Sequence, residues 1–472
     1  SSMEDPARNV ASNSLTRVRK PASRAKARSV TNSVPEVILR DTSLNSAIAL
    51  LPSNYNFEIH KTVWKVRKEG IKSVALQFPE GLLMYACVIS DIIQRFGGAG
   101  QVIILGDVTY GACCIDDFSA EKLGAELLVH YGHSCLVPIN TTKIKVLYVF
   151  VEIQFDCAHL EAVLKQHFDP AQHSKLALMG TIQFTAALHK ARQSLLDVYP
   201  NLYVPQVKPL SPGETLGCTS PILPEDCSAL IFVADGRFHL EAAMIQNPAI
   251  AAYRYDPYSK ILSSEGYDTA TLRRNRWAHI EQARASAKRF GLILGTLGRQ
   301  GSPAMFHRAR TLLQKHGRTC VPFLMAEIVP QKLFMMKEID AWVQIACPRL
   351  SIDWGSDLPK PLLTAYELQV MLGEAPWLDV YPMDYYSRTG GDWSNSLHYS
   401  SSSSSSSTRS KPTATASSTS TSTSSTSGSV KKDTCDNCSN AASTSTSTST
   451  ISSNVNVPAA AAIKSSSSAA TT

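Results

Sequence analysis

The sequence lacks any apolar run long enough to cross a membrane. Its 472 residues are 44% hydrophobic, yet no stretch approaches the roughly 18 consecutive apolar residues that a transmembrane helix needs. No secretory signal is recognisable either, so we expect the 11 cysteines to be reduced thiols, because disulfides are rare in reducing compartments. We therefore expect a cytoplasmic protein without membrane contact, long enough for about three domains.

Beyond its first residues the chain carries little excess charge of either sign. The formal net charge is +7, but residues 1–28 alone hold seven Lys or Arg against two acidic residues. We interpret residues 1–34 as a disordered basic arm. A transit peptide has similar Arg and Ser content, but Glu4, Asp5 and two prolines interrupt its amphipathic pattern. Nucleic-acid binding through the arm is not favoured, because no aromatic residues are interleaved with the charges.

Short apolar runs alternate with helical patterns along most of the chain, which predicts an α/β fold with mostly parallel strands. Strands are expected at 73–78, 101–106, 126–130, 145–152, 175–179, 202–204, 229–234, 290–295, 319–323 and 341–345. Helices are expected at 62–70, 81–95, 120–123, 159–166, 184–197, 270–289, 303–315 and 330–337. On the helix at 270–289 we expect the arginines, Arg273, Arg274, Arg276 and Arg284, to be mostly solvated.

These elements divide into three similar units, which we interpret as three related α/β domains at 35–168, 169–268 and 269–390. Residues 391–472 are dominated by Ser, Thr and Ala, a composition that cannot bury enough apolar surface to fold, so we expect a disordered tail. The tail contains a CxxC, Cys435 to Cys438. It is a weak metal motif, because a tetrahedral site needs four ligands and no second pair lies nearby.

Three cysteines stand in loop-like surroundings, one in each predicted domain: Cys113, Cys218 and Cys347. Cys113 follows a predicted strand, where open α/β sheets place their ligand chemistry. Three thiolates can hold a 4Fe-4S cluster and leave one iron open, whereas structural zinc takes four ligands. The alternative is that each is an ordinary buried cysteine, the commonest fate of the residue. We assign that fate to the remaining cysteines between 87 and 320 that lie within apolar elements: Cys87, Cys135, Cys157, Cys227 and Cys320.

Seven motifs, in this order, resemble one known family. They are LPSNYNFEI from Leu51, YGACC from Tyr110, YGHSC from Tyr131, LGCT from Leu216, DGRFH from Asp235, LGTLGRQG from Leu294 and ACPRLSIDW from Ala346. The family is subunit 1 of 2-(3-amino-3-carboxypropyl)histidine synthase, which acts first in diphthamide biosynthesis, and the resemblance runs from about Leu50 to Tyr386.

The resemblance implies three related domains around a central 4Fe-4S cluster, with Cys113, Cys218 and Cys347 as its ligands. Adjacent Cys114 leaves a one-residue ambiguity, and the family's glycine-alanine-cysteine pattern favours Cys113. Subunit 2 of the same synthase does not keep all three ligands, which favours subunit 1 here. The CxxxCxxC signature of radical S-adenosylmethionine enzymes is absent.

The implied reaction is the transfer of a 3-amino-3-carboxypropyl group from S-adenosylmethionine to the imidazole C2 of a histidine in translation elongation factor 2. The implied partners are subunit 2, as a heterodimer, and a small metal-bearing electron donor. The alternative is a metal-stabilised scaffold subunit whose partner carries the chemistry.

The residues that bind the reagent are predicted from their positions after strands. Its carboxylate needs a cation, and Arg237, Arg299 and Arg349 each follow a predicted strand end. Arg349 is the first candidate, because it stands two residues from Cys347. The glycine-rich loop from Gly295 to Gly301, with Gly295 and Gly298 as candidates, could bring backbone amides to a ligand, or it could be a tight turn. His239 and His133 could line the cavity or be structural.

Overall fold

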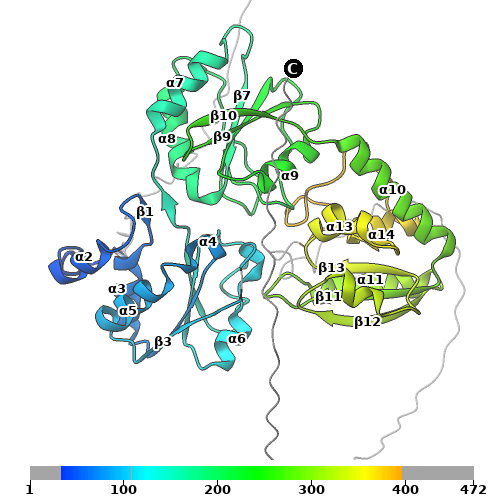
Figure 1. The fold of residues 1–472 in the computed structure, drawn as a ribbon, viewed down its shortest axis with the longest axis horizontal. Coiled ribbons are helices and arrows are strands. Elements are labelled where there is room, and N and C mark those ends of the chain that lie inside the picture. Colours follow the sequence, from blue (N-terminus) through cyan, green and yellow to red (C-terminus); the bar gives the residue numbers. More distant parts are fainter. Residues whose placement is uncertain (1–32, 108, 396–472) are drawn as a thin grey trace, which may run out of the picture. The chain divides into compact units, whose positions relative to one another are not determined.

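The structure, a computed structural model, describes residues 33–107 and 109–395, which lie within one compact unit (Figure 1). This part of the chain forms three four-stranded sheets and one two-stranded sheet, so the predicted α/β class with small, mostly parallel sheets is confirmed. Within it no helix is long and apolar enough to cross a membrane. Residues 1–32 and 396–472, including Cys435 and Cys438, lie outside the described residues, and the domain boundaries stay predictions.

The first sheet has the strand order β3-β2-β4-β5, with all strands parallel. Its strands are β2 (Ser73–Gln77), β3 (Gln101–Ile104), β4 (Leu127–Tyr131) and β5 (Lys145–Val149). Because side chains alternate along a strand, Val74 and Leu76 join the core under α3 (Ile59–Glu69) and α5 (Ala86–Gly97), whereas Ala75 packs on the other face with α6 (Asp117–Lys122).

Short elements surround this sheet. They are α1 (Glu36–Leu39), α2 (Thr42–Ile48), α4 (Glu80–Leu83), and β1 (Tyr55–Asn56), which pairs antiparallel with β6 (Glu152–Ile153). The helix predicted at 81–95 is divided into α4 and α5, and α5 ends where Gly98 adopts a φ of +73°.

The second sheet has the order β10-β9-β8-β7, and its edge strand β10 is antiparallel. Its strands are β7 (Leu176–Gly180), β8 (Ala229–Val233), β9 (Ala251–Asp256) and β10 (Ile261–Glu265). Helices α7 (Cys157–His167) and α8 (Thr185–Leu195) cover one face and α9 (Phe238–Gln246) the other (Figure 1). The sequence did not predict α9, β9 or β10, and the strand predicted at 202–204 forms only a bridge from Tyr203 to Ala177.

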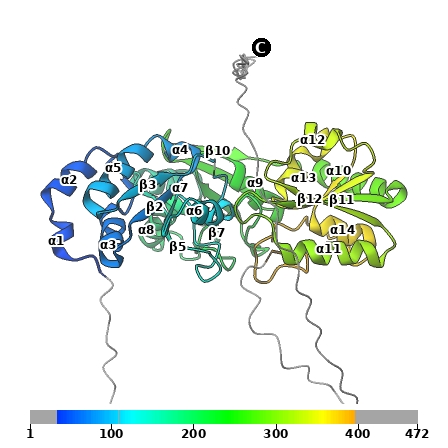
Figure 2. The ribbon, with the colours of Figure 1, turned by 90° about the horizontal axis from the view of Figure 1, so that it is seen from below.

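The third sheet has the order β12-β11-β13-β14, all parallel. Its strands are β11 (Arg289–Gly295), β12 (Thr319–Met325), β13 (Ala341–Ile345) and β14 (Leu362–Leu363). Figure 2 shows α11 (Pro303–Lys315) and α12 (Pro330–Phe334) on opposite sides of this sheet. The prediction for α11 is confirmed: Ser302 caps it by accepting the Met305 N–H at 3.4 Å, and Pro303 opens it.

The long helix α10 (Thr269–Ser286) packs against α14 (Ala365–Leu372), and here one prediction is wrong. Arg276 was expected to be solvated but is 1% exposed. Its guanidinium makes two 2.6 Å hydrogen bonds to the Glu367 carboxylate and donates to the Ser351 and Leu362 carbonyls at 2.7 Å. A buried charge is tolerated when it is paired and fully hydrogen-bonded, and the helical pattern alone could not show that Glu367 lies opposite.

Candidate metal centre

The three cysteine loops all lie at the carboxyl ends of strands. Cys113 stands in a short 3₁₀ turn, Ala112–Cys114, between β3 and α6. Cys347 stands between β13 and α13 (Arg349–Trp354). The Cys218 loop precedes β8 but is bound to the end of β7, because Gly180 donates to the Gly213 carbonyl at 2.9 Å and accepts from Thr215 at 3.2 Å. Loops at this edge of a parallel sheet are where α/β proteins bind ligands.

Backbone contacts between sheets hold these loops against one another. The Arg299 N–H, after β11, donates to the Cys113 carbonyl at 2.8 Å. Arg349 stands two residues after Cys347, and its side-chain Nη1 donates to the carbonyl of Gly217 at 3.3 Å. Gly217 directly precedes Cys218. Cys113 and Cys218 also belong to one apolar cluster, together with Ala112, Tyr385 and Tyr386. The three loops therefore meet in one place.

The three thiols are close enough to shift one another's pKa. Burial raises the pKa of Cys218, and Cys347 adds to this effect. Burial also raises the pKa of Cys347, to about 11. A hydrogen bond with Cys114, burial, Cys347 and Cys218 together raise the pKa of Cys113. Because charges influence one another appreciably only at short range, the sulfur atoms share one site.

The environments of Cys113 and Cys114 differ. Cys114 is 1% exposed, and its sulfur accepts a hydrogen bond from Gln300 Nε2 at 3.5 Å. Cys113 is only half-buried and lies in the apolar cluster with Cys218. Cys114 also affects the pKa of Cys347, so both sulfurs are near. A sulfur that accepts an amide hydrogen bond can still bind iron, so Cys113 as the ligand stays a prediction.

The donor set fits a cluster better than a single ion. Within residues 33–107 and 109–395, no three His, Cys, Asp or Glu side chains are grouped closely enough to hold one metal ion. In an iron-sulfur cubane each thiolate binds a different iron atom, so its ligands stand further apart than the ligands of one ion. Three thiols from three loops, Cys218 buried and Cys113 and Cys347 half-buried, suit that arrangement, and metal binding would provide the free energy to deprotonate them.

Arg349 is 4% exposed, and protein acceptors occupy its guanidinium. Its Nε donates to both Asp353 oxygens at 2.9 Å, and its other nitrogens donate to Glu241 at 2.6 Å and to the Phe238 carbonyl at 2.9 Å. These bonds join α13, which follows Cys347, to α9 and, through Gly217, to the Cys218 loop. Its predicted role as a carboxylate ligand stays a prediction.

The two other candidate arginines also have carboxylate partners. Arg299 binds Asp117 through two hydrogen bonds of 2.8 and 2.6 Å, which join the third sheet to α6 of the first. Arg237 pairs with Glu241 at 2.9 Å and Glu265 at 3.4 Å, but its side chain is 51% exposed. Of the three predicted arginines, Arg237 is therefore the most accessible to a further anion.

The two candidate glycines allow close backbone approach. Gly298 has a φ of +53°, and a Cβ there would stand 2.5 Å from the Cys114 carbonyl carbon. A Cβ at Gly295 would stand 2.5 Å from the Cβ of Ala346. Both contacts bring a segment of the third sheet close to a cysteine loop. This close packing alone requires glycine at the two positions, so no bound ligand is needed to account for them. Their predicted role in reagent binding is untested.

The two candidate histidines lie near each other and near Arg349. Burial lowers the pKa of His239 to about 4, and Arg349 contributes. Burial also lowers the pKa of His133 to about 4, with His239 as the next cause. Both imidazoles are therefore neutral at pH 7, so they can donate or accept one hydrogen bond each without adding charge.

Sequence reasoning missed the residues that hold the cysteine loops. Gln77 Nε2 donates to the Cys114 carbonyl at 2.9 Å while its Oε1 accepts the Asp116 N–H at 3.2 Å. Gln344 Nε2 donates to the Cys347 carbonyl at 2.9 Å while its Oε1 accepts the Ala346 N–H at 2.9 Å. A polar residue near the end of an otherwise apolar strand was the available signal, directly before the cysteine loop for Gln344 and on the neighbouring strand β2 for Gln77.

The cysteines predicted to be ordinary buried residues are not all buried. Cys227 is buried, Cys157 and Cys320 are half-buried, and Cys87 and Cys135 are exposed. The prediction is wrong for Cys87 and Cys135, because Cys87 lies on the outer side of α5 and Cys135 follows β4 in a loop.

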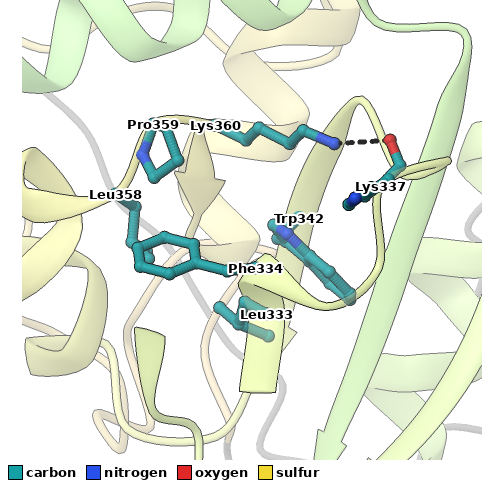
Figure 3. Close-up of a pocket in the computed structure, with 7 residues that line it drawn as sticks. All are labelled: Leu333, Phe334, Lys337, Trp342, Leu358, Pro359 and Lys360. Carbon is teal, nitrogen blue, oxygen red and sulfur yellow. Dashed lines mark hydrogen bonds between the residues drawn. The ribbon is translucent and has the colours of Figure 1, made fainter. Parts of the chain in front are cut away.

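An apolar pocket of about 350 Å³ lies elsewhere in the third sheet. Figure 3 shows it between α12, the start of β13 and the turn before β14, with Phe334, Trp342 and Leu358 among the lining residues. Trp342 stands near the amino end of β13 and Cys347 follows its carboxyl end. The pocket is therefore separate from the candidate metal centre.

Comparison with known proteins gives consistent matches. A family described as "Putative diphthamide synthesis protein" matches residues 78–382. The 2-(3-amino-3-carboxypropyl)histidine synthase subunit 1 of Dictyostelium discoideum is 52% identical over 370 residues, covering 77% of this chain and 78% of that protein. The Bos taurus protein of the same name is 55% identical over 366 residues, covering 77% and 82%. The crystal structure of Dph2 from Pyrococcus horikoshii with a 4Fe-4S cluster is 26% identical, with a TM-score of 0.58, and covers 70% of this chain and 93% of that one.

Proposed function

The chain belongs to the family of 2-(3-amino-3-carboxypropyl)histidine synthase subunit 1, and from this membership we propose that it catalyses the first step of diphthamide biosynthesis. The reaction transfers the 3-amino-3-carboxypropyl group from S-adenosylmethionine to the imidazole C2 of a histidine in translation elongation factor 2. Both proteins would meet in the cytoplasm.

The reaction is balanced without net oxidation. The bond between the sulfonium sulfur and the γ-carbon of the methionine portion breaks, and a carbon–carbon bond forms at C2 of the imidazole. The C2 hydrogen leaves as a proton, and methylthioadenosine is the second product. One electron is needed to break the carbon–sulfur bond, and one electron is returned when the ring regains its aromaticity.

The convergence of Cys113, Cys218 and Cys347 is the observation that carries this proposal. These thiolates would hold a 4Fe-4S cluster which, when bound, supplies the electron and an open iron for the sulfonium reagent. The cluster in the related Dph2 structure supports the same cofactor here. Burial of Cys218 and partial burial of Cys113 and Cys347 reduce the access of water to the site, which strengthens electrostatic interactions with a charged reagent.

The chain's other residues would bind and orient the reagent. Arg237 also bonds protein acceptors, Glu241, Glu265 and the Gly266 carbonyl, but its side chain is the most exposed of the three arginines, which favours it for the reagent carboxylate. The neutral imidazoles of His239 and His133 could accept hydrogen bonds from the reagent ammonium.

Partners follow from the same membership. The name "subunit 1" of the relatives supports a second subunit, which we propose is subunit 2 of the synthase in a heterodimer. A small metal-bearing protein would supply electrons, since nothing in the proposed chemistry of this chain generates them.

A scaffold function is the second candidate, because Arg349 and Arg299 are engaged with protein carboxylates as structural residues would be. In that case a cluster here would only stabilise the fold and the partner subunit would perform the transfer.

One experiment tests the enzyme against the scaffold. The purified heterodimer, reconstituted anaerobically and reduced with dithionite, is given S-adenosylmethionine and elongation factor 2, and methylthioadenosine is measured by mass spectrometry. We expect Cys347→Ala to lose product, while the matched control Cys320→Ala, in the same sheet, keeps it. Product formation by Cys347→Ala at the wild-type rate would favour the scaffold.

A further inference from the structure

The last described residues of the chain return to the Cys218 loop. We call residues 383–395 the return segment. Its first part runs antiparallel to the loop, with Asp384 bridged to Thr219. The Ser220 N–H donates to the Met383 carbonyl at 2.8 Å, and the Tyr385 N–H donates to the Cys218 carbonyl at 3.2 Å. The segment therefore binds the backbone of the proposed ligand itself.

The second part of the return segment fixes the first. Asp384 accepts hydrogen bonds from the Trp393 indole at 2.9 Å and from the Gly391 N–H at 3.0 Å. The Trp393 ring packs against Tyr366 of α14, with the ring centroids 4.7 Å apart. The backbone at Tyr385 is therefore held by contacts on both sides.

Tyr385 has a buried hydroxyl without a partner. The residue is 7% exposed, and its hydroxyl oxygen is fully buried with no hydrogen bond to any group in the described part of the chain. Buried hydroxyl groups are normally hydrogen-bonded, because an unpaired one loses its interaction with water and gains nothing. This hydroxyl is the kind of exception that indicates a missing ligand.

The surroundings of that hydroxyl are the three proposed ligands. Tyr385 packs in the apolar cluster that contains Cys113 and Cys218. Burial raises its pKa, and the further causes are Cys218, Cys347 and Cys113, so all three thiols lie near the phenol oxygen. The neighbouring Tyr386 differs, because hydrogen bonding to Cys113 is among the causes that raise its pKa after burial. Tyr386 has a thiol partner, and Tyr385 has none.

We propose that the hydroxyl of Tyr385 donates a hydrogen bond to a sulfur atom of the iron-sulfur cluster held by Cys113, Cys218 and Cys347, and that this bond sets the cluster's reduction potential. The proposal rests on the proposed function. Reduction adds negative charge to the cluster, and a hydrogen-bond donor stabilises the more negative state, so the donor makes the potential less negative. Tyr385 keeps its proton throughout.

Tyr385→Phe tests the proposal by removing one oxygen atom. The full-length heterodimer is reconstituted anaerobically, its iron and sulfide are counted, and the potential is measured by a redox titration followed by electron paramagnetic resonance. We expect unchanged iron content, a more negative midpoint potential and altered g-values. An unchanged potential and spectrum with a complete cluster would overturn the proposal.

Two further variants make the result specific. Tyr199→Phe removes a buried hydroxyl that donates to the Leu164 and Phe168 carbonyls in the second sheet, and it should leave the potential unchanged. Replacing Tyr385 by 3-fluorotyrosine keeps the hydroxyl and makes it a stronger donor, so the potential should shift in the opposite direction, to a less negative value. This variant decides the matter if Tyr385→Phe does not assemble a cluster, and an unshifted potential would then overturn the proposal.

The proposed function fails separately. If the wild-type chain binds no cluster, or binds one that Cys113→Ala, Cys218→Ala and Cys347→Ala leave intact, the proposed metal centre itself is wrong. If the wild-type cluster depends on these cysteines but its potential ignores Tyr385, only the role of Tyr385 is wrong.

Discussion

The Cys113 and Cys347 loops each bind a glutamine from a strand of their own sheet, whereas the Cys218 loop binds both the end of β7 and the far end of the chain. Gln344 lies on β13 and binds the backbone of the Cys347 loop that follows it, and Gln77 lies on β2, beside β3, and binds the backbone of the Cys113 loop that follows β3. The Cys218 loop instead receives the Tyr385 N–H and the Thr219–Asp384 bridge from the return segment. Two parts of the site therefore depend on contacts within one sheet, and the third depends on a contact across more than 160 residues of sequence.

Removing the return segment should have the largest effect. Truncation after Pro382 exposes the Cys218 loop and removes Tyr385 and Tyr386 from the apolar cluster, so we expect nearly complete loss of bound iron after anaerobic reconstitution. Truncation after Asn395 is the matched control and should retain iron. Wild-type iron content in the shorter chain would show that β7 alone is sufficient to position Cys218.

Replacing the glutamines should have an intermediate effect. Gln344→Leu leaves the Ala346 N–H and the Cys347 carbonyl unpaired, and each buried unsatisfied group costs about 1–3 kcal/mol. We expect the free energy of unfolding, measured with urea, to fall by about 2–4 kcal/mol and iron to be retained less tightly. Gln77→Leu should behave alike, whereas Gln282→Leu, on the exposed side of α10, should change neither quantity. An unchanged free energy of unfolding in Gln344→Leu would show that Gln344 does not support the Cys347 loop.

Lowering the pH should weaken the support of the Cys113 loop but not that of the Cys347 loop. We expect this to be the smallest of the three effects. Gln77 accepts a hydrogen bond from His130 Nδ1 at 2.9 Å, and burial lowers the pKa of His130 well below 6.5. Gln344 instead bonds the Ser351 hydroxyl at 3.1 Å, which does not titrate. The unfolded state binds a proton at His130 below about pH 6.5 and the folded state does not, so stability falls as pH decreases from there.

The slope from His130 approaches about 1.4 kcal/mol per pH unit. Urea unfolding of the metal-free chain between pH 7 and 5 measures it. His130→Gln should make the slope shallower by up to about 1.4 kcal/mol per pH unit without removing it, because burial also lowers the pKa of His133 and His239. Ser351→Ala should leave the slope as steep as in the wild type. An equal slope in His130→Gln and the wild type would show that another group titrates.

Patterns among neighbouring residues predicted the order of most helices and strands and several of their boundaries. The order of strands and helices, α11 with its Ser-Pro start, and the positions of Cys113 and Cys347 after strands follow from apolar periodicity and turn residues. Cys218 lies in a long connection without a strand directly before it, so its glycine-rich surroundings indicated a loop, and only the family resemblance implied that it shares a cluster with the other two.

Long-range partners could not be predicted in this way. Arg276 is indistinguishable from its solvated neighbours on α10 until Glu367 is known to face it. The return segment has no helical or strand period, and its pairing with Thr219 is invisible in either stretch alone. The three arginines near the site follow strands as expected, but only the structure could show their carboxylate partners.

The return segment also determines when the site can be completed during synthesis. A ribosome makes the chain from its amino end, so the Cys113 and Cys218 loops emerge long before Tyr385 does. Until residues 383–395 leave the exit tunnel, the Cys218 loop lacks half of its support and the nascent chain cannot close around a cluster. Iron and sulfide would therefore be delivered only after residues 383–395 have emerged, and a ribosome stalled before this point would carry a chain with its thiols unprotected.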